Sequence, residues 1–349
     1  MLQKNWKHVL PFALTTLVCM TSVARAETKT TTTTNPDSAH LRNLDNRVSA
    51  LEQRKGAGGM INPQGRPQVR DGVDLFLYGN LLYWNAHENG LIVAQKEASE
   101  RFTAVDLSGK WNWGFRAGVG YNTMHDGWDL RLTWLRFTDT GSHRPRTDAA
   151  TRFHVDNPWG GGGVEYSALR GYWGLNLNQL DLDLGREFFV SKWLTLRPHM
   201  GLRTDWIHQN VNVALTSLSG NAASLVEKDR WWGIGIEGGL DTQWGLGGGW
   251  SVFGNMTGAV LYGLHEITGT STAYAEFKNF YRISHPILDF QLGLRWDNMF
   301  YNDRFHLGLD LGWEHHVYFS QNQFPTSSNA NANGDLTTQG WTFAARFDF

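Results

Sequence analysis

The chain has 349 residues, and its 31 Lys and Arg nearly balance its 33 Asp and Glu. This balance argues against general nucleic-acid binding, which needs a basic surface. The 39 Gly and 17 Trp suit a sheet with tight turns and aromatic surfaces better than a helical enzyme.

The first 26 residues have the pattern of a secretory signal peptide. Two lysines precede the apolar stretch VLPFALTTLVCMTSVA, and alanines at 24 and 26 fit a cleavage site. We therefore expect cleavage after Ala26. This removes Cys19, the only cysteine in the sequence, so we expect a mature chain with neither disulfides nor cysteine catalysis.

Two linkers and a short helix are predicted next. Residues 27–37 are a Thr-rich linker, and residues 55–72 are a flexible Gly- and Pro-containing linker. Between them, residues 38–54 predict a short coiled-coil-like helix with apolar positions three, four and three apart. The helix is either a stalk that forms a homo-oligomer or a lone amphipathic helix, and the positions in question are Leu41, Leu44, Val48 and Leu51.

From residue 73 onward the apolar positions recur every second residue. In DFQLGLRWD at 289–297, apolar and aromatic residues alternate with Asp, Gln, Gly and Arg, and RFHLGLDLGWEH at 304–315 repeats the pattern. Such segments are strands with one apolar and one polar face. In the stretch LNLNQLDLDL the parity changes between Leu177 and Leu180, which predicts a β-bulge.

We expect these strands to form a transmembrane β-barrel over residues 73–349. The apolar faces carry Trp and Phe at their ends, and the other faces carry charges and Gly, as in a barrel with a polar lumen and aromatic girdles. The prediction is an all-β antiparallel barrel of about ten strands (range 8–12), preceded by the short periplasmic helix. We place the strands at 73–85, 111–122, 128–138, 167–186, 193–213, 229–242, 250–264, 285–297, 303–318 and 339–349.

Short turns and long loops alternate between the predicted strands. Barrels of this kind have long extracellular loops and short periplasmic turns, so both termini are expected in the periplasm. The final strand, GWTFAARFDF, is expected to face lipid with its aromatic side chains and to close against the first strand. These aromatic residues are Trp341, Phe343, Phe347 and Phe349.

Two stretches carry a resemblance to a known family. GNLLYWNAHENGL at 79–91 and LDLDLGREFFVSKWLTLRPHMGLR at 180–203 resemble the Legionella-type pore-forming outer-membrane proteins, which are similar to the MOMP-like porins of environmental chlamydiae. The resemblance implies a porin. Separately, the carboxy-terminal aromatic strand with its final Phe349 resembles the signal that the outer-membrane assembly machinery recognises. Disulfide cross-linking, as in the cysteine-rich chlamydial porin, is not implied, because the mature chain lacks cysteine.

Charged residues on the polar faces are candidates for the lumen. They are either a selectivity lining or a set of internal salt bridges that fills the barrel. The expected inward cations are Arg116, Arg131, Arg170, Arg197, Arg203, Arg295 and Arg346. The expected inward anions are Asp129, Asp205, Glu237, Asp241, Asp289, Asp310, Glu314 and Asp348, in near balance with the cations.

Other motifs predict no cofactor, metal or catalytic site. GIGIEG at 233–238 lies within a strand with no helix after it, unlike a dinucleotide-binding turn. Adjacent His315 and His316 point to opposite faces of a strand, which disfavours a shared metal ion. Rim histidines and acids, such as His208, His265 and Glu266, show no spacing diagnostic of catalysis.

The sequence thus favours an outer-membrane porin-like channel for passive diffusion of small hydrophilic solutes or ions. One alternative is a structural or adhesive outer-membrane barrel without an open pore, and another is an outer-membrane barrel enzyme. The expected partners are outer-membrane lipid, the barrel assembly machinery and further copies of the chain, but no nucleic acid.

Overall fold

The structure is a computed structural model that describes residues 62–98, 101–123, 126–143, 152–155, 164–272, 274–324 and 334–349. The predicted signal peptide, the Thr-rich linker, the helix at 38–54 and the first part of the second linker lie outside these residues. All described residues belong to one compact unit, Asn62–Phe349.

The described residues contain thirteen strands. They are β1 (Leu75–Ala98), β2 (Arg101–Ser108), β3 (Asn112–Asn122), β4 (Trp128–His143), β5 (Arg152–Val155), β6 (Val164–Arg186), β7 (Phe188–Phe189), β8 (Leu194–Ser217), β9 (Ala222–Gly247), β10 (Trp250–Ser271), β11 (Tyr274–Phe300), β12 (Phe305–Asn322) and β13 (Gly334–Asp348). In the described part of the chain, no helix has the length and hydropathy needed to cross a membrane.

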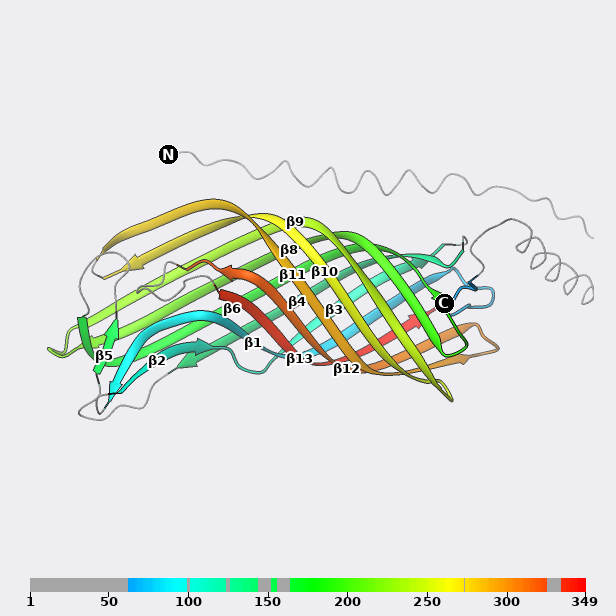
Figure 1. Cartoon of the computed structure of the whole chain (residues 1–349), viewed down its shortest axis with the longest axis horizontal. Coiled ribbons are helices and arrows are strands. Elements are labelled where there is room, and N and C mark those ends of the chain that lie inside the picture. Colours follow the sequence, from blue (N-terminus) through cyan, green and yellow to red (C-terminus); the bar gives the residue numbers. More distant parts are fainter. Residues whose placement is uncertain are drawn as a thin grey trace, which may run out of the picture. The chain divides into compact units, whose positions relative to one another are not determined.

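Ten of these strands pair antiparallel in a closed ring, which confirms the predicted all-β barrel. The order is β1, β3, β4, β6, β8, β9, β10, β11, β12, β13 and back to β1. The short strands β2, β5 and β7 lie on the sheet beside β1, β6 and β8. Figure 1 shows the ring strands running obliquely along the barrel.

The barrel has two different ends. At the short-turn end, tight connections join β3 to β4, β9 to β10 and β11 to β12, and the carboxy terminus lies there too (Figure 1). The turn between β9 and β10 has positive φ at Gly247, Gly248 and Gly249, a conformation that favours glycine. At the opposite, long-hairpin end, β1 with β2 and β10 with β11 continue as paired extensions.

The predicted strand limits were too short at the long-hairpin end. Residues 86–110 and 265–284 were expected as loops, but most of them are paired strands in the β1–β2 and β10–β11 hairpins. Their outward positions include His87 and Glu266, so the contrast between an apolar and a polar face weakens there. The backbone groups still need hydrogen-bond partners, and the neighbouring strand supplies them.

The predicted β-bulge between Leu177 and Leu180 is also wrong. β6 keeps an unbroken register with β4 and with β8 through this stretch. Leu177 points inward and is buried, whereas Leu180 points outward. The strand does not change face; the interior that it lines changes from polar to apolar.

The outward face carries an aliphatic band between two aromatic belts. On β8 the outward residues run from Leu194 through Met200 and Leu202 to Trp206. Twelve residue steps of about 3.3 Å, tilted by about 40°, span about 30 Å, the thickness of a bilayer core. We call the belt nearer the long hairpins the hairpin-side belt; it contains Tyr83, Trp113, Trp134, Trp206, Trp232, Tyr262, Trp313 and Trp341.

Inward glycines make room for large inward side chains. A Cβ added at Gly120 would lie 1.9 Å from the Phe76 ring, and one at Gly118 would lie 2.2 Å from the Tyr78 ring. Glycine on β3 therefore lets two rings of the paired strand β1 lie flat against the inner wall.

Candidate functional site

The barrel interior is the candidate site, and its short-turn half holds a polar cavity of about 230 Å³. All ten ring strands contribute residues to the lining of this cavity, and most of those residues are charged or polar. The lining includes six arginines and eight carboxylates, together with His199 and His316. We call these charged residues and their partners the salt-bridge layer.

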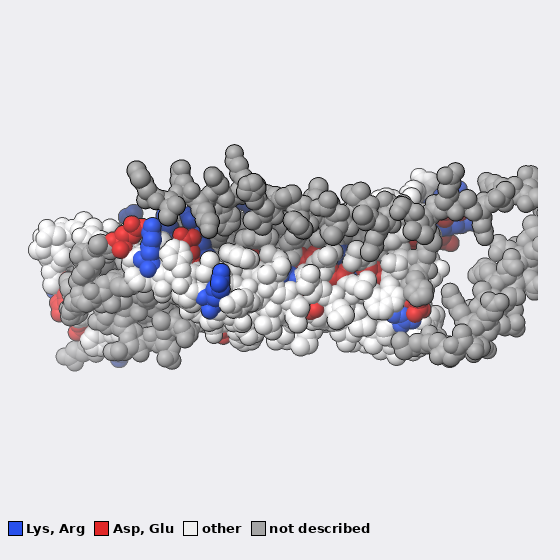
Figure 2. Space-filling view, turned by 90° about the horizontal axis from the view of Figure 1, so that it is seen from above, with Lys and Arg blue, Asp and Glu red and all other residues white. Residues whose placement is uncertain are grey.

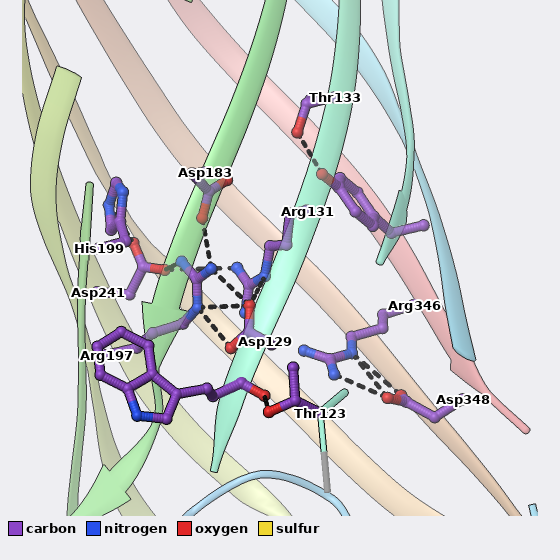
Figure 3. A network of polar contacts seen from close by, with 12 residues as sticks. Thr123, Asp129, Arg131, Thr133, Asp183, Arg197, His199, Asp241, Arg346 and Asp348 are labelled. Carbon is purple, nitrogen blue, oxygen red and sulfur yellow. Dashed lines mark hydrogen bonds and ion pairs between the residues drawn. The ribbon is translucent and has the colours of Figure 1, made fainter. Parts of the chain in front are cut away.

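One centre of the salt-bridge layer is Asp129 on β4, which receives two guanidinium groups (Figure 3). Arg197 on β8 donates to it at 2.6 and 2.9 Å, and Arg131 Nε lies 3.1 Å from Asp129 Oδ1. Arg197 also pairs with Asp183 on β6 and, at 3.2 Å, with Asp241 on β9. A Cβ at Gly185 would collide with this guanidinium, so glycine is needed beside it.

A second centre is Arg203 on β8, which is buried among three carboxylates. Its guanidinium lies 3.1 Å from Asp181, 2.9 Å from Glu237 and 2.6 Å from Asp289. These acids come from β6, β9 and β11, so one arginine ties together four strands of the ring. Charge-assisted bonds of this geometry are among the stronger ones in proteins.

A third centre joins the opposite wall of the barrel. Arg116 on β3 forms a bidentate pair with Glu314 on β12, at 2.8 and 3.0 Å. His316 lies between Glu314, at 3.1 Å, and Asp289, at 2.8 Å. Through Asp289 this centre is continuous with that of Arg203, so the layer crosses the lumen.

The remaining predicted cations pair near the short-turn end. Arg295 binds Asp310 through two bonds of 2.7 Å. Arg346 donates to Asp348 at 2.7 Å, and His306 lies 2.7 Å from the same carboxylate. Each of these pairs joins inward positions, as the strand alternation predicts.

Two predicted lumen residues differ from the others. Arg170 was expected to point inward, but it is exposed on the outer parity of β6, so that expectation is wrong. The strand alternation continues without a bulge, and this places even-numbered residues of β6 outside. Asp205 points inward and is fully buried, yet neither carboxylate oxygen has a hydrogen-bond partner among the described residues.

The sequence reasoning missed several members of the layer. Asp181, Asp183 and Glu187 line the cavity, and His199 and His316 join them. For Asp181 and Asp183, alternation with Leu180, Leu182 and Leu184 was the signal that could have found them. The described lining contains six arginines and eight carboxylates, so the carboxylates outnumber the arginines by two.

The long-hairpin half of the interior is filled by an apolar core. Its side chains come from nearly all ring strands, and the largest of them are fully buried. Trp84 donates its Nε1–H to Thr342 at 3.1 Å, and Trp173 donates to Gln209 at 3.0 Å. The core also includes Leu82, Leu91, Leu107, Leu135, Phe137, Phe153, Leu175, Leu177, Ile207, Val211, Trp231, Leu261, Ile287 and Tyr318.

A small polar cluster lies inside this half, beyond the hairpin-side belt. His265 Nδ1 lies 2.9 Å from Asp229, and its Nε2 lies 2.8 Å from His285. Burial and the nearby Asp229 raise the pKa of the Glu88 carboxyl well above its usual value. Burial alone raises the pKa of Glu227 to about 7.

The glycine-rich motif and the histidine pair considered in the sequence both lie within strands. GIGIEG lies within β9, and His316 points inward toward Asp289 whereas His315 lies on the outer parity of β12. Within the residues that the structure describes, no group of three or more His, Cys, Asp and Glu could hold a metal ion.

Three solved structures with a similar course of the chain are distant in sequence. The outer membrane protease OmpT from Escherichia coli is 10% identical, with 81% of this chain and 99% of that chain covered and a TM-score of 0.46. The P. putida toluene transporter TodX is 9% identical, with 82% and 92% covered and a TM-score of 0.32. A major outer membrane protein from Thermus thermophilus is 10% identical, with 79% and 98% covered and a TM-score of 0.32.

No curated protein matches the chain. Residues 67–349, however, match the family described as Legionella pneumophila major outer membrane protein precursor. This match extends over the ten-stranded ring, the two aromatic belts and the charged interior. The chain therefore belongs to this family of outer-membrane β-barrel proteins.

Proposed function

We propose that the protein is an outer-membrane barrel with a closed interior, which serves the envelope as a structural barrel that displays its long hairpins. The observation that carries this proposal is the apolar core, which fills the lumen between the polar cavity and the long-hairpin end. Trp84, Phe137 and Trp173 are each fully buried in it.

A passive pore needs a continuous path of water through the lumen. Apolar constrictions resist wetting, and this core extends over several inward residues of β1, β6 and β8. Ten strands also give a barrel nearer in size to the filled eight-stranded type than to sixteen-stranded porins. Both arguments favour the structural alternative over an open channel.

Conductance in planar bilayers tests this proposal. We expect no stable conductance steps from the wild-type protein. The double variant Trp84→Ala and Trp173→Ala should produce steps, because it removes two rings from the core. The matched control, Trp206→Ala with Trp232→Ala, removes two rings from the outward belt and should stay silent.

Regular steps from the wild-type protein would contradict the closed barrel. They would favour the second candidate, a porin-like channel for passive diffusion of small hydrophilic solutes or ions. The polar cavity of about 230 Å³ supports this candidate. Such a channel would open only when the apolar core is displaced, and its acidic lining would favour cations.

Cation preference gives the channel candidate its own test. In a salt gradient, the reversal potential of the conducting protein should have the sign expected for a channel that is more permeable to cations than to anions. The changes Asp241→Asn and Glu187→Gln remove two lining charges, so they should move it toward zero. No movement would contradict a role of this lining in ion selection.

We do not propose the third alternative, a barrel enzyme. His265, one of the rim histidines considered for catalysis, pairs with an acid but is fully buried. Its ring nitrogens bond to Asp229 and His285, and neither of these is a hydroxyl nucleophile. General-base activation of a nucleophile needs such a group within hydrogen-bond reach.

We infer that the short-turn end and both termini face the periplasm and that the long hairpins face outward. We also propose that the carboxy-terminal aromatic residues serve as the signal for the barrel assembly machinery. Support for the second proposal comes from the closure of the barrel: Phe349 N–H donates to Leu75, and Val73 N–H donates to Phe349, at 3.1 and 3.3 Å.

The oligomer predicted from the helix at 38–54 also remains a proposal. If Leu44 and Val48 are seam residues, changing both to Asp should dissociate an oligomer and leave the barrel folded. Light scattering in detergent measures the mass. An unchanged mass together with a folded barrel would favour the lone amphipathic helix.

A further inference from the structure

A basic surface lies on the outer wall of the barrel, immediately beyond the hairpin-side belt. The outward column of β9 runs through Leu240, Ile236 and Ile234 to Trp232, and its next two outward residues are Arg230 and Lys228. The column thus changes within one step from lipid-facing to cationic. Figure 2 shows Lys and Arg side chains standing out from a largely white surface toward the long-hairpin end.

Neighbouring strands extend this surface. Arg230 is in register with His208 on β8 and with Glu266 on β10. Arg282 on β11 is paired with Leu264 on β10, and Leu264 is paired on its other side with Trp232 of β9. Arg282 therefore lies level with the hairpin-side belt. We call Lys228, Arg230 and Arg282 the basic patch, and Glu266 is the acidic residue beside it.

The ion pairing of the basic patch contrasts with that of the interior. All six arginines that line the cavity form ion pairs with carboxylates. Among the residues that the structure describes, Lys228, Arg230 and Arg282 form no ion pair and are exposed. Lys278, farther from the belt on β11, already pairs with Glu276 at 3.1 Å.

Unpaired cations at this level lie where lipid headgroups meet the protein. The belt below them marks the interface, because Trp and Tyr sit at the headgroup level of a bilayer. Residues two apart on one strand face are about 7 Å apart, and adjacent strands are about 4.8 Å apart. Arg230 and Arg282 lie on the two strands that flank β10, about 10 Å apart across the sheet and one two-residue step apart along it. A phosphate group can lie between their long side chains, with Lys228 at its edge, and a guanidinium can bind its oxygens in a bidentate manner.

We propose that the basic patch binds the phosphate-bearing headgroup of an anionic lipid in the membrane leaflet at the long-hairpin end. The acyl chains of this lipid would lie on the aliphatic column of β9, whose outward residues Ile234 and Ile236 are unshielded by protein. The patch is continuous with the lipid-facing surface, so one lipid molecule contacts both. This argues for a lipid in preference to a soluble anion.

Native mass spectrometry of the full mature chain in detergent tests the proposal. The protein is titrated with dimyristoyl phosphatidic acid and, separately, with dimyristoyl phosphatidylcholine, which has the same chains and no net charge. We expect tighter retention of phosphatidic acid by the wild type. The triple variant Lys228→Gln, Arg230→Gln and Arg282→Gln should weaken it by about fivefold for each charge removed.

A matched control removes three cations from the short-turn end, with Arg70→Gln, Lys192→Gln and Arg304→Gln. It should retain phosphatidic acid as the wild type does. Resistance to SDS before heating shows that each variant is folded. Equal retention of both lipids, or no loss in the patch variant, would overturn the proposal. Displacement of phosphatidic acid by millimolar inorganic phosphate would also overturn it, because it would assign the patch to a soluble anion.

Discussion

The two halves of the barrel interior are built in opposite ways, although the same strands form both. One face of β8 carries Arg197 and Arg203 in the salt-bridge layer and then Ile207, Val211 and Val213 in the apolar core. The change occurs beside Trp206, a member of the hairpin-side belt. Inside the membrane span the barrel is apolar outside and polar inside. Beyond it the interior becomes mainly apolar, apart from the polar cluster around His265, and the outer face gains charged residues such as Lys228 and Arg230.

This difference follows from the medium that surrounds each half. Lipid requires apolar outward residues, so polar residues are left for the interior, where they must pair with one another. Beyond the belt the outward residues meet water, and the interior is free to pack as in a soluble protein. One strand therefore changes the chemistry of both faces without changing its parity.

The largest expected effect comes from breaking the salt-bridge layer at its centre. Arg203→Leu leaves Asp181, Glu237 and Asp289 without their shared cation, which should destabilise the barrel by about 4 kcal/mol. The temperature at which the folded form disappears on unboiled SDS gels should fall accordingly. Arg282→Leu removes an unpaired outward arginine and should leave this temperature nearly unchanged. Equal losses from both variants would contradict the central role of Arg203.

A slightly smaller loss is expected from the apolar core. Phe137→Ala deletes a fully buried ring and should cost about 3 kcal/mol through lost burial and the cavity left behind. Its control is Phe115→Ala, which truncates an outward ring that is 37% exposed. The same gel assay compares the two. If Phe115→Ala proves more harmful than Phe137→Ala, the long-hairpin half does not pack as described.

The buried acid Glu227 makes the long-hairpin half sensitive to pH. Its pKa is raised to about 7, so the folded state binds more protons than the unfolded state above the ordinary Glu value of 4.5. Stability should therefore be fully present near pH 4 and fall as the pH rises to about 7, by at most about 3 kcal/mol. Glu88, whose pKa is also raised, acts in the same direction.

Glu227→Gln should flatten this pH dependence, because the amide does not titrate. Urea titrations of protein in detergent at pH 5 and pH 7.5 would measure the difference. Glu165→Gln, an exposed acid on β6, is the control and should keep the wild-type slope. A slope that survives in the Glu227 variant would assign the pH dependence to Glu88 or to another group.

The smallest effect on stability concerns barrel closure. Deleting Phe349 removes two backbone hydrogen bonds and one ring contact to Phe347, at 5.9 Å, and should cost about 2 kcal/mol or less. Its effect on membrane yield should be larger if the residue serves the assembly machinery. Outer-membrane fractions would show the yield, with Phe102→Ala as a control for an exposed ring elsewhere. A normal yield would contradict the assembly role.

Part of the salt-bridge layer could be predicted from parity alone. Arg116, Arg131, Arg197 and Arg203 all lie on polar faces in the sequence, because lipid excludes charge from the other face. Their partners could not be predicted. Arg116 and Glu314 are 198 residues apart in the chain, and only closure of the ring brings them within 3 Å.

The sequence by itself determined the class of fold, the number of ring strands and the lipid-facing surface, because strands that cross a bilayer must alternate outward apolar residues with inward ones. It also determined the short turns, where glycine and tight spacing leave few conformations. These are local properties, and each is readable within a short stretch of the chain.

Only the tertiary structure decided what fills the barrel. Leu177 is as apolar as Leu180, so hydropathy cannot tell an outward residue in the membrane from an inward one beyond it. The two are distinguished by their height relative to the belt, which depends on the tilt and register of all ten strands. The apolar core is therefore a property of the assembled ring, because it is shared by side chains that no single strand brings together.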